Sequence, residues 1–210
     1  MATRPSLKPR RGDARAALLD ATHVVVRRKG WSATSVDELC AAAGVTKGAF
    51  FHHFASKEAL GVAAAHAWTA RAQELIFELP DYVNIADPLD RVLGHIDFRL
   101  GMIEGTAEDY SCFIGTMVQE AFATSENLRA ASGASITAYA ERLAQDFQQA
   151  IDLYPAHADV TALSLAYHVQ AALQGGFVLA KAQGDPAYAR DTVRHLKRYV
   201  TMVFGKEPHR

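Results

Sequence analysis

The side chains best suited to chemistry in this sequence lie close together, between residues 46 and 57. Most are hydroxyl, ammonium and imidazole groups, which can donate hydrogen bonds to phosphate oxygens and to the edges of bases. Gly48 leaves room for a close approach of the backbone, and Phe51 can contact a thymine methyl group. The pattern therefore predicts binding to nucleic acid. The polar members are Thr46, Lys47, His52, His53 and Lys57.

Two short helices are predicted to position these side chains. Over residues 36–43 the apolar positions recur at the spacing of one buried helical stripe. Ser35 and Glu38 have the spacing of a capping box at the start of this helix, and Gly44 can adopt the left-handed conformation that ends it. Thr46 can cap the next helix. The arrangement predicts a helix-turn-helix unit, whose second helix can enter the major groove of DNA.

The second helix divides into two faces. Phe50 and Phe54 are four residues apart and should fix one face to the core. Lys47 lies near the N-terminus of the helix, where a phosphate would also meet free backbone N–H groups. A cation in the first turn of a helix opposes the helix dipole, so a phosphate contact is the better explanation of Lys57, which follows the capping residue Ser56.

Residues 36–57 resemble the DNA-binding signature of the tetracycline-repressor (TetR) family. The matching motifs are Ala-Gly-Val-Thr-Lys-Gly at 43–48, His-Phe at 53–54 and Ser-Lys-Glu at 56–58. The resemblance extends back over residues 15–35, as a first helix and the turn that begins at Gly30. It implies a dimeric DNA-binding regulator whose larger C-terminal part binds an effector.

The sequence departs from the family pattern at Phe51, where members usually carry a tyrosine whose hydroxyl meets a phosphate. Phe51 cannot make that hydrogen bond, and we expect Thr46 or His52 to compensate. The predicted phosphate contacts include Thr34, Lys57 and Lys47. The complete predicted DNA-binding set is Thr34, Ser35, Thr46, Lys47, Gly48, Phe51, His52, His53 and Lys57.

The charge distribution favours DNA contact by the N-terminal part alone. The 210 residues have a net charge of −1, but residues 1–60 hold ten Lys/Arg and five Asp/Glu, a net charge of +5. The rest of the chain has a net charge of −6. Residues 1–12 are basic and predicted to be disordered when free; they either reach phosphates and a minor groove or serve only as a solubilising tail.

The composition indicates a soluble cytosolic protein. Half of the residues are apolar, yet no apolar run approaches the ~20 residues that span a bilayer, and the N-terminus lacks the apolar core of a signal peptide. Cys40 and Cys112 are the only cysteines. Two cysteines form neither a disulfide framework nor a metal-ligand cluster, so we expect no metal and no cofactor.

The periodicity predicts an all-α protein of about nine helices, since no segment shows sustained alternation of period two. We expect an N-terminal three-helix DNA-binding domain over residues 1–58 and a larger helical effector-binding and dimerisation domain over residues 59–210. One long helix should run from Ser56 to about Leu79 and connect the two, and residues 105–110 should form a loop. The later helices are expected at about 87–104, 111–124, 125–154, 159–183 and 186–204.

The last two helices are predicted to form a dimer interface. Residues 162–180 are apolar almost all round, and the final helix has an apolar face. In a monomer one face of this pair would remain exposed to water, whereas pairing with a second copy gives a four-helix interface like that of the resembled family. A monomer whose other helices cover both faces is the alternative. A two-fold dimer also suits a palindromic operator with half-sites ~34–36 Å apart.

The larger domain contains bulky side chains with interspersed polar groups, a composition found in small-molecule sites between helices. It shows no nucleophile motif, no Gly-rich phosphate loop and no paired carboxylates at metal spacing, so we do not expect an enzyme. Few charges mark the region, which favours a neutral, partly apolar effector. The candidate effector-binding residues are Trp68, His95, Phe98, Met102, Cys112, Phe113, Met117, Phe147, His168, Gln174 and Phe177.

Cys112 is open to two interpretations. Residues 111–120, with Gln-Gly-Gly-Phe at 174–177, resemble a subgroup of the family in which some members use a cysteine near this position to sense electrophiles or oxidants. No cationic residue is adjacent to Cys112 in the sequence, and Glu108 and Asp109 would disfavour its thiolate. A buried, inert thiol is therefore favoured over a redox sensor.

Three functions are compatible with the sequence, in this order. The first is a homodimeric DNA-binding regulator, a repressor that a small molecule releases from its operator. The second is an effector-free DNA-binding protein whose larger domain only dimerises. The third is a helical enzyme with a structural helix-turn-helix, which the lack of a catalytic constellation disfavours.

Overall fold

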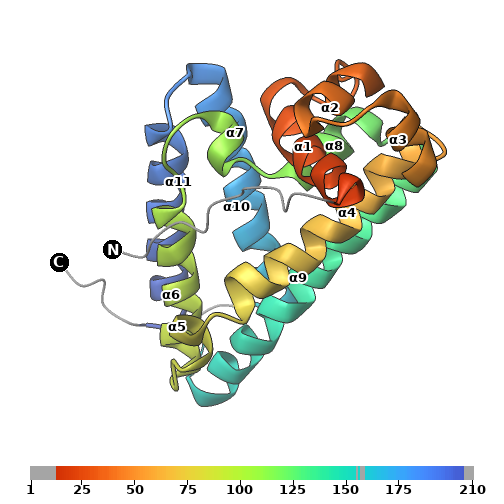
Figure 1. The fold of residues 1–210 in the computed structure, drawn as a ribbon. Helices are drawn as coiled ribbons and strands as arrows, with labels where there is room; N and C mark the ends of the chain where they lie inside the picture. The colour runs from red at the N-terminus through yellow and green to blue at the C-terminus, as the bar shows by residue number, and fades with distance from the viewer. Residues whose placement is uncertain (1–12, 155, 157–158, 206–210) are drawn as a thin grey trace. The chain divides into compact units, whose positions relative to one another are not determined.

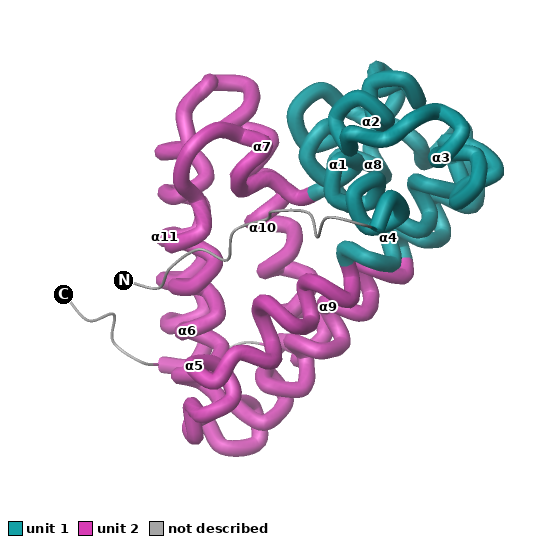
Figure 2. The backbone as a smooth tube through the Cα atoms, viewed as in Figure 1, with its two compact units in different colours: residues 1–68, 113–133 teal, residues 69–112, 134–210 magenta. Residues whose placement is uncertain are grey.

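The computed structural model describes residues 13–154, 156 and 159–205, so the basic residues 1–12 lie outside the described part. The described residues form helices and contain no strand, which confirms the all-α prediction (Figure 1). They divide into two units. Unit 1 comprises residues 1–68 and 113–133, and unit 2 comprises residues 69–112 and 134–210 (Figure 2).

Unit 1 contains the predicted helix-turn-helix, with α1 packed against α2, α3 and α8. Its core is built around Leu18, Leu39 and Phe50, whose side chains are completely buried. The unit takes the N-terminal parts of α4 and α9 as well as complete helices. The bounds are α1 Ala14–Lys29, α2 Val36–Ala43, α3 Lys47–His53, α4 Lys57–Ala72, α8 Phe113–Ala121 and α9 Glu126–Leu153.

Unit 2 holds the remainder of α4 and α9, together with a continuous apolar core. Helix α11 packs against both α10 and α6. A Cβ atom on Gly176 would lie 3.2 Å from the Ala189 Cα atom, so a glycine permits the close approach of α10 and α11. The bounds are the π-helix η1 Gln73–Phe77, α5 Pro80–Val83, α6 Pro88–Gly101, α7 Ala107–Tyr110, α10 Ala162–Gln183 and α11 Ala187–Val203.

Aspartate side chains cap two further helices. The Asp13 carboxylate accepts from the backbone N–H of Ala16, and Asp87 accepts in the same way from Asp90. No described helix is long and apolar enough to cross a membrane.

Several helix boundaries differ from the prediction: α6 ends at Gly101 rather than at about 104, and α8 spans Phe113–Ala121 rather than 111–124. Helix α10 begins at Ala162 rather than at residue 159, because Thr161 forms a capping box with Ser164. The predicted loop at 105–110 contains the short helix α7, which a capping box between Thr106 and Asp109 stabilises. The helix that begins at Lys57 continues past Ala72 as one turn of π-helix.

The two units do not follow the predicted division at residues 58 and 59. Residues 113–133, which we assigned to the larger domain, belong to unit 1. Polar contacts explain this: Glu58 accepts hydrogen bonds from Ser125 Oγ at 2.7 Å and from Asn127 Nδ2 at 3.1 Å, and Glu120 accepts one from the backbone N–H of Ser32 at 2.8 Å. The helices α4 and α9 each contribute residues to both units.

Candidate nucleic-acid interface and effector region

Helix α3 is held in place by a cap at its start and by two buried phenylalanine side chains. Thr46 caps its start by accepting a hydrogen bond from the Ala49 N–H at 3.1 Å. Gly44 ends α2 in the left-handed conformation, with φ of 67°, which explains why a glycine stands there. Phe50 and Phe54 are buried, with their rings 6.0 Å apart, as the sequence predicted. One face of α3 is thus held against the core of unit 1.

The opposite face of α3 is exposed. Thr46, Lys47, Gly48, Phe51, His52 and His53 are all exposed to solvent in unit 1. Phe51 is 52 % exposed, a large fraction for an aromatic side chain, and its ring meets only the edge of Phe50 among the described aromatic contacts. A Cβ atom on Gly48 would approach nothing closer than the Thr46 hydroxyl at 3.8 Å, so the backbone here is open. This face can therefore contact DNA without rearrangement.

Lys47 forms an exposed ion pair with Asp37. Its ammonium group lies 2.9 Å from the Asp37 carboxylate, and both side chains are largely exposed. The hydrogen bond to Asp37, and then the charge of Asp37, raise the pKa of Lys47. Exposed ion pairs contribute little to stability, so a phosphate can replace Asp37 at small cost.

The structure does not support the predicted phosphate contact of Thr34. Its side chain is only 2 % exposed, and its hydroxyl donates a 2.6 Å hydrogen bond to the Gly30 carbonyl oxygen. It stabilises the turn before α2 and cannot present its hydroxyl to a phosphate. We therefore remove Thr34 from the DNA-binding set.

Ser35 is exposed but engaged in the capping box at the start of α2. Its hydroxyl accepts from the Glu38 N–H, and Glu38 accepts from the Ser35 N–H at 2.8 Å. Glu38 also pairs with Lys29 at 2.5 Å. This hydrogen bond from Lys29, followed by those from Ser35, lowers the pKa of Glu38 to about 2. A carboxylate beside Ser35 makes it a weak candidate for a phosphate contact.

Lys57 is half-buried on Trp31. Its ammonium group donates a 2.6 Å hydrogen bond to the Trp31 carbonyl oxygen and lies 4.3 Å from the centre of the indole ring. Burial lowers its pKa. An ammonium group has three protons, so two remain for other acceptors.

Comparison with known proteins decides the family. The family model described as "Bacterial regulatory proteins, tetR family" matches residues 18–64, and that described as "Tetracyclin repressor-like, C-terminal domain" matches residues 88–196. The transcriptional regulator AcuR of Cereibacter sphaeroides is 30 % identical over 92 % of this chain and 94 % of its own length. The chain belongs to the TetR family. It is a DNA-binding transcriptional regulator and not an enzyme.

Solved structures of TetR-family proteins share the fold. A regulatory protein TetR from Rhodobacter sphaeroides is 27 % identical, with a TM-score of 0.73 over 89 % of this chain and 98 % of that one. Escherichia coli NemR, solved in its reduced form, is 23 % identical, with a TM-score of 0.74 over 92 % of this chain and 98 % of that one.

Three candidate effector residues of this TetR-family regulator lie in unit 1. Trp68, Phe113 and Met117 share that unit, and the rings of Trp68 and Phe113 both meet His23, at 5.2 and 4.9 Å. The Arg27 guanidinium lies 5.2 Å from the Trp68 ring. These side chains contribute to the packing of unit 1.

The remaining candidates lie in unit 2 and differ in burial. Phe147 is buried and stacks on Phe204, and Phe177 is buried beside Tyr110. On α6, His95 is buried whereas Phe98 is exposed, as is Met102 just after the helix; Cys112 and Gln174 are half-buried. His168 is exposed and its ring meets that of Tyr199 at 4.8 Å.

The sequence interpretation missed a buried polar cluster around His95. Tyr139 on α9 hydrogen-bonds to His95 Nε2 at 2.8 Å and accepts from Arg99 Nη1 at 3.0 Å. Burial, and then the charges of Arg99 and Arg142, lower the pKa of His95 to about 3. His95 and Arg99 are four residues apart and so share one helix face, a signal that the sequence already contained.

A second buried group is centred on Asp146, which is 1 % exposed at its side chain. Arg91 pairs with one carboxylate oxygen at 2.6 Å and Arg142 with the other at 2.8 Å, and the Tyr82 hydroxyl donates to the same carboxylate. Burial raises the pKa of Tyr82, and the hydrogen bond to Asp146 adds to the effect. This pairing compensates the charge of Asp146 inside unit 2.

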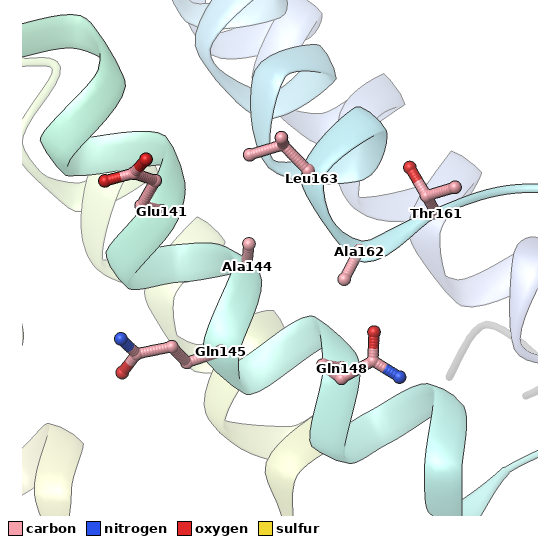
Figure 3. Close-up of a pocket in the computed structure, with 7 residues that line it drawn as sticks. All are labelled: Glu141, Ala144, Gln145, Gln148, Thr161, Ala162 and Leu163. Carbon is pink, nitrogen blue, oxygen red and sulfur yellow. The ribbon is translucent and has the colours of Figure 1, made fainter.

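Unit 2 also has a pocket of about 430 Å³ on α9 and the start of α10, which Figure 3 shows in close-up. The α9 residues lie on one side and those at the start of α10 on the other. None of the candidate effector residues lines it. The lining residues are Glu141, Ala144, Gln145, Gln148, Thr161, Ala162 and Leu163.

Proposed function

We propose that this TetR-family regulator is a homodimeric, cytoplasmic repressor that binds a palindromic operator in double-stranded DNA and is released by a small-molecule effector. The exposed outer face of α3 is the observation that supports this proposal most directly. That face is polar and open, while Phe50 and Phe54 anchor the opposite face.

The proposed contacts fall into two classes. Base edges are met by Thr46, Lys47, Gly48, Phe51 and His52, with Gly48 allowing close backbone approach and Phe51 available for a thymine methyl group. Phosphates are held by Lys47, by the two free protons of Lys57 and by the basic residues 1–12. His53 is exposed beside His52 and is proposed as a flanking contact.

The proposed dimer uses α10 and α11, the helices over which the sequence predicted an interface at about 159–183 and 186–204. Both helices carry large apolar side chains that remain exposed in the single chain, and water-exposed apolar patches of this kind mark interfaces. A second copy would cover them in a four-helix arrangement. The exposed members are Leu163, Tyr167, Val178, Leu179, Tyr188, Tyr199 and Met202.

The proposed switch acts through the two helices that belong to both units. An effector bound in unit 2 would change the direction of α4 or α9, and hence the spacing of the two DNA-reading units in the dimer. Half-sites must stay ~34–36 Å apart, or a multiple of that, for both units to bind. Moving the equilibrium from 1:99 to 99:1 requires the effector to favour the released state by ~5.5 kcal/mol.

Thiol sensing through Cys112 is a second candidate. Cys112 is half-buried, whereas Cys40 is buried, and burial followed by the charge of Asp37 raises the pKa of Cys40. A structural neighbour, NemR, was solved in a reduced form. Labelling of the native protein with a thiol reagent should modify Cys112 before Cys40; labelling of both only after denaturation would end this candidate.

A mobility-shift experiment tests the proposed function. The purified protein is mixed with a fragment of the DNA upstream of its own gene, across a salt series, beside a scrambled fragment of the same length. We expect a sequence-specific shift with the stoichiometry of a dimer.

His52→Ala should weaken operator binding, whereas His66→Ala, which alters an exposed histidine on α4, should not. Absence of binding at low salt would refute the assigned role of α3. A specific complex that no small molecule releases would leave an effector-free DNA-binding protein.

A further inference from the structure

Two buried nitrogen atoms in the cluster around His95 have no hydrogen-bond partner among the described residues. His95 is completely buried, and its Nδ1 atom has no hydrogen-bond partner among the described residues. The same holds for Arg99 Nε, one helical turn further along α6. Buried polar atoms are rarely left unpaired, because a buried donor without an acceptor has lost its hydrogen bonds to water and gained none.

The hydrogen bonds of Tyr139 define which kind of group is missing. Arginine only donates, so the Tyr139 oxygen accepts from Arg99. When the single Tyr139 proton is given to His95 Nε2, the His95 hydrogen resides on Nδ1. The other tautomer would leave both the phenol proton and Nδ1 unpaired. The favoured arrangement therefore leaves two N–H donors, at His95 Nδ1 and Arg99 Nε, without an acceptor among the described residues.

The charges around the cluster favour an anion. Arg91 and Arg142 share the single carboxylate of Asp146, and no carboxylate of the described chain lies within 4 Å of the Arg99 guanidinium. Arg99, by contrast, donates to the uncharged Tyr139 hydroxyl. Because the pKa of His95 is lowered to about 3, the imidazole is neutral and adds no charge. An anionic acceptor would therefore match the charge of Arg99.

The surroundings of the cluster are apolar and aromatic. The Phe77 ring stacks on His95, with ring centres 5.3 Å apart and planes 13° apart, and Tyr82 meets His95 edge-on at 6.0 Å. Leu100 and Cys112 pack, partly buried, against the same core. Water competes poorly in such an environment, so a charge-assisted hydrogen bond is stronger there than at the surface.

We propose that unit 2 binds a small carboxylate with an apolar body, whose carboxylate group accepts from Arg99 beside His95 and Tyr139. The inference rests on the proposed effector-responsive function and defines its ligand class. It replaces the neutral effector expected from the sequence. A monocarboxylate matches the charge of the site better than a phosphate dianion does, because only the Arg99 guanidinium would pair with it.

Calorimetric titration of the full-length protein, without DNA, tests the carboxylate site. The probes are benzoate and butanoate, each compared with its primary amide, benzamide and butanamide, at constant ionic strength. We expect the carboxylates to bind at least about tenfold more tightly than the amides, since a hydrogen bond to a charged group contributes about that factor. Equal binding of acid and amide, or no binding of either carboxylate, would overturn the proposal.

Variants locate the site. Arg99→Met should weaken carboxylate binding to the level of the amides. Arg194→Met is the matched control, because Arg194 is exposed on α11 and paired with Asp191, and it should bind as the wild type does. If Arg99→Met unfolds by circular dichroism, Arg99→Lys keeps the charge but loses the Nε donor and should bind about tenfold more weakly. Wild-type affinity in a folded Arg99 variant would refute the site.

The mobility-shift assay separates this inference from the proposed function. Carboxylate binding that depends on Arg99 but leaves the DNA complex intact would support the site and refute release by this ligand. Release of DNA by a neutral compound, with no carboxylate bound, would support the regulator mechanism and refute the carboxylate site.

Discussion

Lys57 and Trp31 form a contact that joins the start of α4 to the turn before α2. The Lys57 ammonium group donates a 2.6 Å hydrogen bond to the Trp31 carbonyl oxygen and lies 4.3 Å from the indole centre. The indole in turn lies so close to Gly61 that a Cβ atom there would come within 2.7 Å of Trp31 Cη2. From its position in the first turn we interpreted Lys57 as a phosphate ligand. The contact with Trp31 gives it a structural role as well.

Replacing Lys57 separates the two roles. Lys57→Met removes the hydrogen bond and the cation–π contact, and should lower the free energy of unfolding by about 1–2 kcal/mol in a urea titration. If Lys57 also holds a phosphate, the slope of log K against log salt should fall in magnitude by about 1 for every DNA sequence. The control is Lys197→Met, whose ammonium pairs with Asp97 on α6. Reduced stability with an unchanged salt slope would leave Lys57 a purely structural residue.

Phe51→Tyr is expected to strengthen operator binding. The side chain is 52 % exposed, so a hydroxyl can be added without a packing cost, and it would restore the phosphate contact usual in the resembled family. One additional hydrogen bond of about 0.5–1.5 kcal/mol lowers Kd about two- to tenfold, measured by fluorescence anisotropy. Phe122→Tyr, at a 63 % exposed phenylalanine also in unit 1, should leave Kd unchanged. Weaker binding by Phe51→Tyr would indicate that the added hydroxyl meets no phosphate and disturbs the proposed contact of Phe51 with a thymine methyl group.

Met202→Glu tests the dimer. Met202 is 68 % exposed on α11, so a glutamate there leaves the single chain intact but would be buried at the proposed interface. In sedimentation velocity we expect the wild type to be a dimer and Met202→Glu a folded monomer. Val83→Glu, at a 52 % exposed valine on α5, is the matched control and should remain a dimer. A dimeric Met202→Glu would place the interface elsewhere.

Local patterns were sufficient to predict the helix-turn-helix. Capping pairs act within four residues of the chain, so Ser35 with Glu38 and Thr46 with Ala49 could be read directly. Thr34 could not, because its role depends on a turn that folds its hydroxyl back onto the Gly30 carbonyl. A threonine just before a capping serine has the same appearance whether it faces a phosphate or the protein.

The interior of unit 2 was less predictable because its interactions are non-local. Tyr139 meets His95 across 44 residues of sequence, and Arg91 meets Asp146 across 55. No periodicity identifies such pairs. Composition alone could only list bulky side chains, and that list mixes residues of both units, Trp68 and Phe147 among them. The pair of His95 and Arg99 was visible as one helix face, but nothing local revealed that the face is buried.

Burial of His95 should make the stability of the protein depend on pH. Burial, reinforced by the charges of Arg99 and Arg142, lowers its pKa from the ordinary value of 6.5 to about 3. Below pH 6.5 the unfolded chain binds a proton that the folded protein does not, so acid favours unfolding. The neutral, buried imidazole costs no stability above pH 6.5. As the pH falls from 6.5 towards 3, the free energy of unfolding decreases by at most about 1.4 kcal/mol per pH unit.

His95→Asn removes this titration. The variant should be less stable than the wild type near neutral pH, because a packed ring is lost, but its free energy of unfolding should fall less steeply between about pH 6.5 and 4.5. Urea titrations at several pH values measure the slope. His66→Asn, at an exposed histidine on α4, should retain the wild-type slope. Equal slopes in His95→Asn and the wild type would mean that the imidazole takes up its proton over the same pH range in the folded and the unfolded protein. A proton would then reside on a ring that stacks against Phe77 and faces two guanidinium charges, and the carboxylate site would have to accommodate a second cation.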